Sequence, residues 1–113
     1  MRVIVHMSPG PNWQPGRNVF EQGEPIEGHL AAMRAHFDAG RLLIGGPFRE
    51  RGAGGIAVLQ VDRVGEAKAL MDADPSVIAG VIAYSVNQLM PVFDEFNGTR
   101  SAGTVTEVAR TLV

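Results

Sequence analysis

Hydrophobic and polar positions along this chain follow two periods, one typical of strands and one typical of helices. Short apolar runs, rich in β-branched residues and bounded in several cases by Gly or Pro, predict four strands. The strands fall at residues 2–7, 41–48, 55–61 and 81–86, and the last can extend across Pro91 to Val92. Apolar residues spaced three and four apart predict helices over residues 25–39 and 63–73. The predicted order is therefore strand, helix, strand, strand, helix, strand.

The two predicted helices carry terminal signals as well as apolar stripes. Pro25 suits a first helical turn, where its missing N–H is no loss, and Gly40 supplies a stop. Asp62 is the predicted N-cap of the second helix, and Pro75 ends that helix before a turn or one-turn helix. The residues expected to face inward are Ile26, Leu30, Met33 and Phe37 in the first helix and Val64, Ala67, Leu70 and Met71 in the second.

This order of elements is the ferredoxin-like, or split β-α-β, pattern of an α+β protein. Two right-handed crossovers place both helices on one face of a four-stranded antiparallel sheet, whose second and third strands form a hairpin. In the first strand Val3, Val5 and Met7 share one face, and Ile4 and His6 share the other. The sheet face without helices is too apolar to stay wet, so we expect a homodimer that pairs through it.

Length, charge and composition narrow the functional class. The chain has 113 residues, which predicts one domain, and its formal net charge is −2 with no basic run. Nucleic-acid binding therefore has no electrostatic support. No apolar run reaches the roughly 18 residues of a membrane span. The absence of cysteine excludes disulfides, thiolate nucleophiles and cysteine metal sites, and we expect a cytoplasmic protein.

The predicted topology brings distant segments to one end of the sheet. The end where the first strand finishes gathers the 8–24 loop, the start of the first helix, the 47–54 turn and the segment after the second helix. His29 and Asp74 both fall there, so we expect an imidazole beside a carboxylate, which is the outline of a general acid–base pair. Asp38 is a rival partner, but it lies about 13 Å further along the same helix and faces away.

Several short motifs occur in an order and spacing that resemble those of a known family. The segments "GHLAAMRAHFDAGRLLIGGPF", "GGIAVLQV" and "EAKALMDADPSVIAGVIAYSV" are similar to the YCII-related (YciI-like) family. The matching motifs are His29-Leu30, Gly40-Arg41-Leu42, Gly46-Pro47, Asp74-Pro75 and Gly80-Val81. The resemblance covers residues 1–93, and the order of the motifs is more specific than any one of them.

The resemblance implies a dimeric α+β barrel built on the ferredoxin-like fold, with His29 and Asp74 as catalytic residues. Most members of the family have no established reaction, and one characterised relative is a dehydrochlorinase of chlorinated hydroxyquinols. The sequence departs from the family pattern at Ser76, where an aromatic residue is common, and in the long Pro/Gly-rich loop that holds Trp13. It departs again in the extension after Phe93. These departures bear on the substrate more than on the fold.

The first functional hypothesis is an enzyme, a lyase or isomerase that uses no cofactor and no metal. His29 moves a proton and Asp74 orients it, in an elimination, an isomerisation or a hydration. The expected substrate is a small organic anion, aromatic or carbonyl-containing, in an apolar cleft. The residues expected to bind it are Trp13, Gly46, Pro47, Phe48 and Arg49, with Arg51 beside them and His6 reaching from the sheet.

Two other functions stay open at this stage. One is a cofactor-free monooxygenase or isomerase of the dimeric α+β barrel type, with its site inside the barrel near His6, Tyr84 or Asn87. The other is a non-catalytic ligand-binding or assembly domain. Substitution of His6 and of His29 by alanine distinguishes the first alternative from the acid–base hypothesis.

The last part of the chain is predicted to lie outside the common domain. The domain spans residues 1–93, and residues 94–113 form an extension, either an arm or a tail. Within the extension, Thr104 to Glu107 matches a capping box that precedes a weak apolar stripe, which predicts a C-terminal helix.

Overall fold

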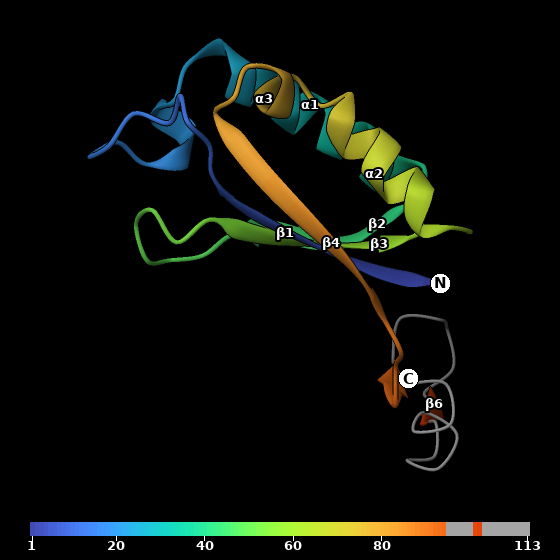
Figure 1. The fold of residues 1–113 in the computed structure, drawn as a ribbon. Helices are drawn as coiled ribbons and strands as arrows, with labels where there is room; N and C mark the ends of the chain where they lie inside the picture. Colours follow the sequence, from blue (N-terminus) through green and yellow to red (C-terminus); the bar gives the residue numbers. More distant parts are fainter. Residues whose placement is uncertain (95–100, 103–113) are drawn as a thin grey trace.

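The structure, a computed structural model, describes residues 1–94 and 101–102. Its main elements follow the predicted order (Figure 1). They are β1 (Arg2–Pro9), α1 (Glu24–Asp38), β2 (Leu42–Pro47), β3 (Gly55–Gln60), α2 (Val64–Asp72), the short helix α3 (Pro75–Ile78) and β4 (Ile82–Leu89). A 3₁₀ helix, η1 (Val19–Glu21), precedes α1, and the short strands β5 (Phe93–Asp94) and β6 (Ser101–Ala102) pair with each other. The predicted C-terminal helix lies outside the described residues.

The main sheet is four-stranded and antiparallel, in the order β2-β3-β1-β4. Both long helices connect strands that are not neighbours in the sheet, and β2 and β3 form the predicted hairpin. This is the ferredoxin-like α+β fold, the subunit fold of dimeric α+β barrels. The helices cover one face of the sheet, and no helix of the described residues covers the other, which we call the open face (Figure 1).

The core lies between the helices and the sheet, and alternate strand residues build it. Val3 and Val5 have no exposed surface, while Ile4 and His6 point to the open face. The register sets Val5 opposite Ala57 on β3 and opposite Val86 on β4, so three strands contribute to one apolar layer. The predicted division of the two faces of the first strand is confirmed. From the second helix, Ala67 and Met71 complete the layer, as expected.

The predicted N-cap of α2 is wrong by one residue. The capping position is Arg63, which is extended and makes no side-chain cap hydrogen bond, and Asp62 is exposed before it. Val61 is buried and exchanges two backbone hydrogen bonds with Met1. Because these bonds hold the chain extended at the edge of the core, the helix begins only at Val64.

The first helix confirms half of its predicted inward stripe: Ile26 is buried and Met33 packs against the core, whereas Leu30 and Phe37 do not. Ile26 and His29 are only 2% and 9% exposed, whereas Leu30 and Phe37 are 48% and 55% exposed. The helix packs against α3 through Gly28, and this contact rotates His29 rather than Leu30 toward the protein interior. A polar residue therefore takes a place that hydrophobic spacing assigned to leucine.

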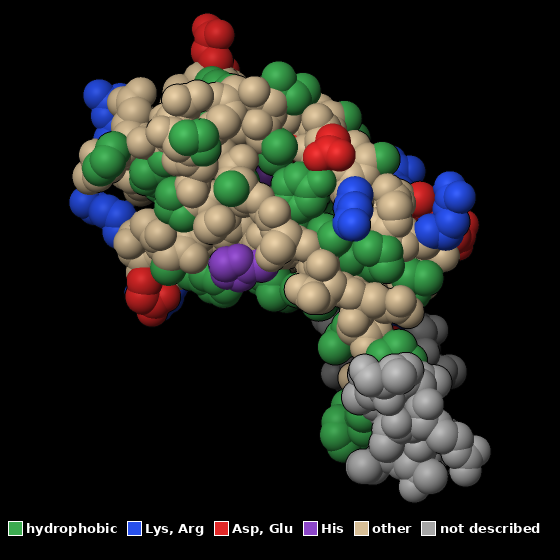
Figure 2. Space-filling view, in the orientation of Figure 1, with side chains coloured by type: hydrophobic (Ala, Val, Ile, Leu, Met, Phe, Trp, Pro, Cys, Tyr) green, Lys and Arg blue, Asp and Glu red, His purple; other side chains and the backbone are tan. Residues whose placement is uncertain are grey.

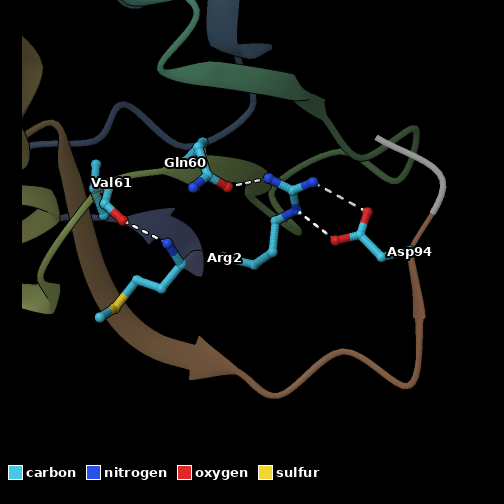
Figure 3. Close-up of polar contacts among 5 residues, drawn as sticks. Arg2, Gln60, Val61 and Asp94 are labelled. Atoms are coloured by element: carbon cyan, nitrogen blue, oxygen red, sulfur yellow. Dashed lines mark hydrogen bonds and ion pairs between the residues drawn. The ribbon is translucent and has the colours of Figure 1, made fainter. Parts of the chain in front are cut away.

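The chain after β4 returns beneath the open face. β4 ends at Leu89 and does not cross Pro91, because proline has no N–H to donate to a neighbouring strand. Asp94 then receives two hydrogen bonds from Arg2, from Nε at 3.0 Å and from Nη2 at 3.1 Å (Figure 3). The Nη1 of the same guanidinium donates to Gln60 Oε1. These contacts attach the segment after β4 to the first strand.

Charged side chains are dispersed over the surface seen in Figure 2, and Lys and Arg form no continuous patch on that face. That face therefore has no basic stripe of the kind that follows a nucleic-acid backbone. Among the described residues, none of the helices combines the length and the apolar character needed to cross a membrane.

Candidate active site

A cleft of about 600 Å³ opens at the end of the sheet where the predicted segments gather. Its walls come from the loop after β1, the first half of α1, β2 and the turn between β2 and β3. Most of its lining is apolar, with aromatic rings from two of these segments. The principal apolar residues are Trp13, Phe20, Leu30, Met33, Pro47 and Phe48. A volume and lining of this kind suit a small organic molecule with a hydrophobic body.

The long loop before α1 is ordered by one buried side chain that the sequence reading did not single out. Gln22 is 3% exposed, and its Oε1 accepts from the backbone N–H of Gln14 at 2.7 Å. Its Nε2 donates back to the Gln14 carbonyl at 3.0 Å and to the Arg17 carbonyl at 3.2 Å. Asn18 caps η1 just before it through a capping box. These hydrogen bonds give the loop a fixed shape, and the loop forms one wall of the cleft.

His29 and Asp74, predicted to be neighbours, are in contact. His29 Nδ1 lies 2.8 Å from Asp74 Oδ2, although the two residues are 45 positions apart. Asp74 is 1% exposed and occupies the N-cap of α3, and His29 lines the cleft. Since Nδ1 faces Asp74, the other ring nitrogen, Nε2, is the one available to the cleft, and it has no hydrogen-bond partner among the described residues.

Ser76 joins this pair and completes a buried cluster. It has no exposed surface, and its Oγ donates to Asp74 Oδ1 at 2.5 Å. Its backbone N–H donates to the same oxygen at 2.9 Å, and its Oγ lies 3.4 Å from His29 Nδ1. The sequence signal was the Asp-Pro-Ser order at a helix start, where side chains commonly bond to nearby backbone groups. That signal predicts a cap and does not predict contact with the histidine.

Gly28 allows the two helices to approach closely enough for the pair to form. A Cβ at this position would lie 2.8 Å from Pro75 Cγ and 2.9 Å from Pro75 Cβ, closer than packed atoms tolerate. Pro75 directly follows Asp74, so the spacing of α1 and α3 at Gly28 sets the distance between histidine and carboxylate. Glycine inside a helix normally destabilises it, which was the one sequence hint of a packing role.

The hydrogen bonds of Asp74 decide its protonation state. Burial by itself raises the pKa of this carboxyl, but the hydrogen bonds from His29 and from the side chain and backbone of Ser76 together lower it below its ordinary value. An ionised carboxylate has no proton to donate. Nδ1 of a neutral His29 is therefore the donor in the contact, which leaves Nε2 with its lone pair and able to accept a proton.

The residues predicted to bind a substrate fall into two groups. Five of them line the cleft with His29, namely Trp13, Gly46, Pro47, Phe48 and Arg49. Arg51 lines it too and reaches the Gly16 carbonyl at 3.4 Å. His6 does not line the cleft. It lies exposed on the open face, with its ring centroid 6.1 Å from that of Phe48.

A site inside the barrel was expected near His6, Tyr84 or Asn87, and the structure places Tyr84 on the sheet face that the helices cover. Its hydroxyl lies on the helix side, where it donates to Asp72 Oδ1 at 2.6 Å, and this bond and burial raise its pKa to about 12. The register pairs Tyr84 with Met7, on the core face of β1. Of these three residues, only His6 and Asn87 lie on the open face.

In the part of the chain that the structure describes, no three His, Asp or Glu side chains gather as a metal site.

The fold also has a counterpart among solved structures. It matches 5-chloro-2-hydroxyhydroquinone dehydrochlorinase (TftG) from Burkholderia phenoliruptrix AC1100, in complex with 2,5-dihydroxybenzoquinone, with a TM-score of 0.63 and 17% sequence identity. The match covers 80% of this chain and 95% of that one. At this identity the likeness establishes the shared fold. No curated protein matches the sequence.

A family model identifies the chain more directly than the structural match does. The model of the YCII-related domain matches residues 1–89, from the first strand to the end of β4. The matched span holds His29, Asp74 and every cleft residue named above. It stops four residues before the boundary at 93 that was predicted from the sequence. This chain belongs to the YCII-related domain family.

Proposed function

We propose that this protein is an enzyme that moves a proton on a small organic molecule, with His29 as the general base and Asp74 as the group that orients it. The observation that carries the proposal is the 2.8 Å contact between a buried carboxylate and a histidine that lines an apolar cleft. A base is useful in catalysis when its free nitrogen reaches the substrate and its protonated form is stabilised. In support of the proposal, His29 lines the cleft with Nε2 unbonded, and Asp74 lies where it can stabilise the protonated ring.

The reaction that we propose is an elimination. His29 Nε2 removes a proton from a hydroxyl of a chlorinated hydroquinone in its keto tautomer, in which the carbon that bears the chlorine is tetrahedral. The O–H electrons form a carbonyl, the ring double bond shifts, and chloride departs with its bonding pair, which leaves a quinone. Asp74 stabilises the imidazolium formed in this step and keeps the ring in place. The structural neighbour is a dehydrochlorinase, so this fold carries such a reaction in at least one other protein. An isomerisation uses the same base and returns the proton to another atom of the substrate. In a hydration the base removes a proton from a water molecule that adds to the substrate.

The cleft favours an aromatic anion as the substrate. Trp13 and Phe48 offer flat apolar surfaces, while Arg49 and Arg51 lie at the turn between β2 and β3 that borders the cleft. Arg49 has no ion-pair partner among the described residues, so its charge is free to attract a phenolate or carboxylate. Glu50 is the acidic side chain of the same turn and disfavours substrates with a second negative charge on that side.

The test is turnover of halogenated hydroquinones, measured as halide release and as a change in ultraviolet absorbance. His29→Ala is expected to lower kcat/KM about 100-fold to 10,000-fold while the fold is retained, because the base is lost. His6→Ala, the matched variant on the open face, is expected to stay within a few-fold of the parent. Loss of activity in His6→Ala with full activity in His29→Ala would contradict the proposal and support a site on the open face.

We also propose that the protein acts as a homodimer that pairs through the open face. Ile44 and Leu89 are 53% and 44% exposed, and Ile4 and Val58 lie between them on the same face. Large apolar side chains on one sheet face favour association. Sedimentation should give twice the monomer mass for the parent and the monomer mass for Val58→Glu. A monomeric parent at micromolar concentration contradicts this proposal and leaves the His29 proposal untouched.

A further inference from the structure

We propose that Ser76 is a positioning residue of the candidate active site. Its hydroxyl holds the ionised Asp74 so that Oδ2 faces His29 Nδ1, and in this way it fixes the histidine proton on Nδ1. This inference rests on the proposed function and extends it to a residue at which the sequence departs from the pattern of the resembling family. The test below is chosen so that the two proposals can fail separately.

The hydroxyl of Ser76 has no structural task apart from this cluster. The backbone of Ser76 is already engaged, because its N–H bonds to Asp74 and its carbonyl accepts from the N–H of Val81 at 3.0 Å. The side chain has no exposed surface, and among the described residues the hydrogen-bond partners of its Oγ are Asp74 Oδ1 and His29 Nδ1. A buried hydroxyl whose hydrogen bonds all go to one acid–base pair acts on that pair.

The geometry divides the two oxygens of Asp74 between two partners. Oδ1 accepts from the N–H and from the Oγ of Ser76, at 2.9 Å and 2.5 Å, and Oδ2 accepts from His29 at 2.8 Å. Two donors on Oδ1 restrict rotation of the carboxylate about its bond to Cβ. With the rotation restricted, Oδ2 stays directed at Nδ1, and the tautomer that leaves Nε2 free is favoured.

A capping role alone does not account for the hydroxyl. The N-cap of α3 is complete once Asp74 accepts from the backbone N–H of Ser76, and alanine at position 76 keeps that N–H. If capping were the whole function, Ser76→Ala would leave the tautomer of His29 unchanged. The positioning role instead predicts a change that can be read from the histidine ring itself.

The experiment is nitrogen NMR of protein labelled with ¹⁵N-histidine, at a pH where the His29 ring is neutral by its own titration. The parent is expected to hold His29 in the Nδ1–H form. Ser76→Ala is expected to shift a measurable fraction to the Nε2–H form, which free histidine favours. Ser76→Thr keeps the hydroxyl and should restore the parent spectrum. Ser85→Ala, an exposed serine on the open face, is the matched control and should resemble the parent.

Turnover supplies the second measurement. Ser76→Ala is expected to lower kcat about threefold to 30-fold with KM within twofold, because part of the enzyme holds an Nε2 that already carries a proton. Identical His29 tautomer ratios in the parent and in Ser76→Ala overturn the inference, whatever the thermal stability of the variant.

The NMR measurement needs no substrate, so it separates the two proposals. If no substrate is turned over but Ser76→Ala shifts the tautomer, the proposed function fails and Ser76 still positions the pair. If His29 is essential for turnover but Ser76→Ala leaves the tautomer unchanged, the function stands and the role of Ser76 is wrong.

Discussion

Among the described residues, two of the poorly exposed polar clusters each pair a nitrogen-containing side chain with an aspartate. In the His29 cluster, formed with Asp74 and Ser76, the His29 and Asp74 side chains are 11% and 1% exposed. In the Arg2 cluster, formed with Gln60 and Asp94, the Arg2 and Asp94 side chains are 9% and 12% exposed (Figure 3). The distances between the nitrogen and the carboxylate oxygen of each pair are also similar, at 2.8 Å and 3.0 Å.

The clusters differ in what their cation can do and in what it faces. A guanidinium keeps its proton at any ordinary pH. Arg2 donates hydrogen bonds to Gln60 and makes a bidentate contact with Asp94. An imidazole gains and loses a proton near neutrality, and His29 lines the cleft with a free nitrogen. Burial and ion pairing therefore do not distinguish a candidate site from a structural contact. A titratable group that borders a cavity is the feature that separates the two clusters.

The comparison is tested most strongly by removing the carboxylate charge from each cluster in turn. Asp74→Asn is expected to lower turnover about tenfold to a thousandfold, because an amide can present its N–H to Nδ1 and force the wrong tautomer. Asp94→Asn is expected to leave turnover per folded molecule unchanged. Halide release by the two purified variants measures the difference. Equal losses in both variants contradict the functional division of the clusters.

Removal of the cation of the Arg2 cluster is expected to change the stability of the protein rather than its turnover. Arg2→Met is expected to lower the free energy of unfolding by about 2 kcal/mol, because largely buried hydrogen bonds to charged groups are lost. Urea denaturation measures the change. Arg34→Met, which breaks an exposed pair with Asp38 at 3.2 Å, is the control and should change stability by less than about 0.5 kcal/mol. Similar losses in the two variants would show that burial does not strengthen the Arg2 contacts.

The spacing of α1 and α3 provides a smaller test that concerns the His29 cluster alone. Gly28→Ala places a methyl group 2.8 Å from Pro75 Cγ, so the helices must separate. The strain exceeds the gain in helix propensity, and we expect a net destabilisation of about 1 kcal/mol together with a loss of turnover. Gly65→Ala in α2 is the matched control, because its methyl group meets no atom within 4 Å and should stabilise the protein slightly. Unchanged turnover in Gly28→Ala contradicts the positioning argument.

The smallest expected effect is on stability in acid. The pKa of Asp74 is lower in the folded protein than in an unfolded chain, where it is about 3.9. Its contribution to stability is present above the unfolded value and is lost as the pH falls through the folded pKa. Urea midpoints measured from pH 6 to pH 2.5 should therefore fall more steeply for the parent than for Asp74→Asn, with Ser76→Ala between them. Parallel curves would contradict the lowered pKa.

Most of the fold could be predicted from the sequence because the signals that specify each strand and helix are local. Alternation in the first strand identified which residues face the helices, and the order of elements led to the ferredoxin-like topology. The errors fall where a neighbouring element decides. The helix at Val64 starts late because Val61 is held by Met1, and Leu30 is exposed because α3 occupies the place beside His29.

The candidate site divides in the same way. Topology alone brought His29 and Asp74 to one end of the sheet, and the family resemblance pointed to the same two residues, so the pair could be predicted. Ser76, Gly28 and Gln22 could not, because their roles depend on contacts made across the loop and between helices. A sequence determines which elements form, since each is set by its own neighbours. Whether a glycine at 28 meets a proline at 75 is decided only when the helices pack, because that contact depends on distances of a few tenths of an ångström.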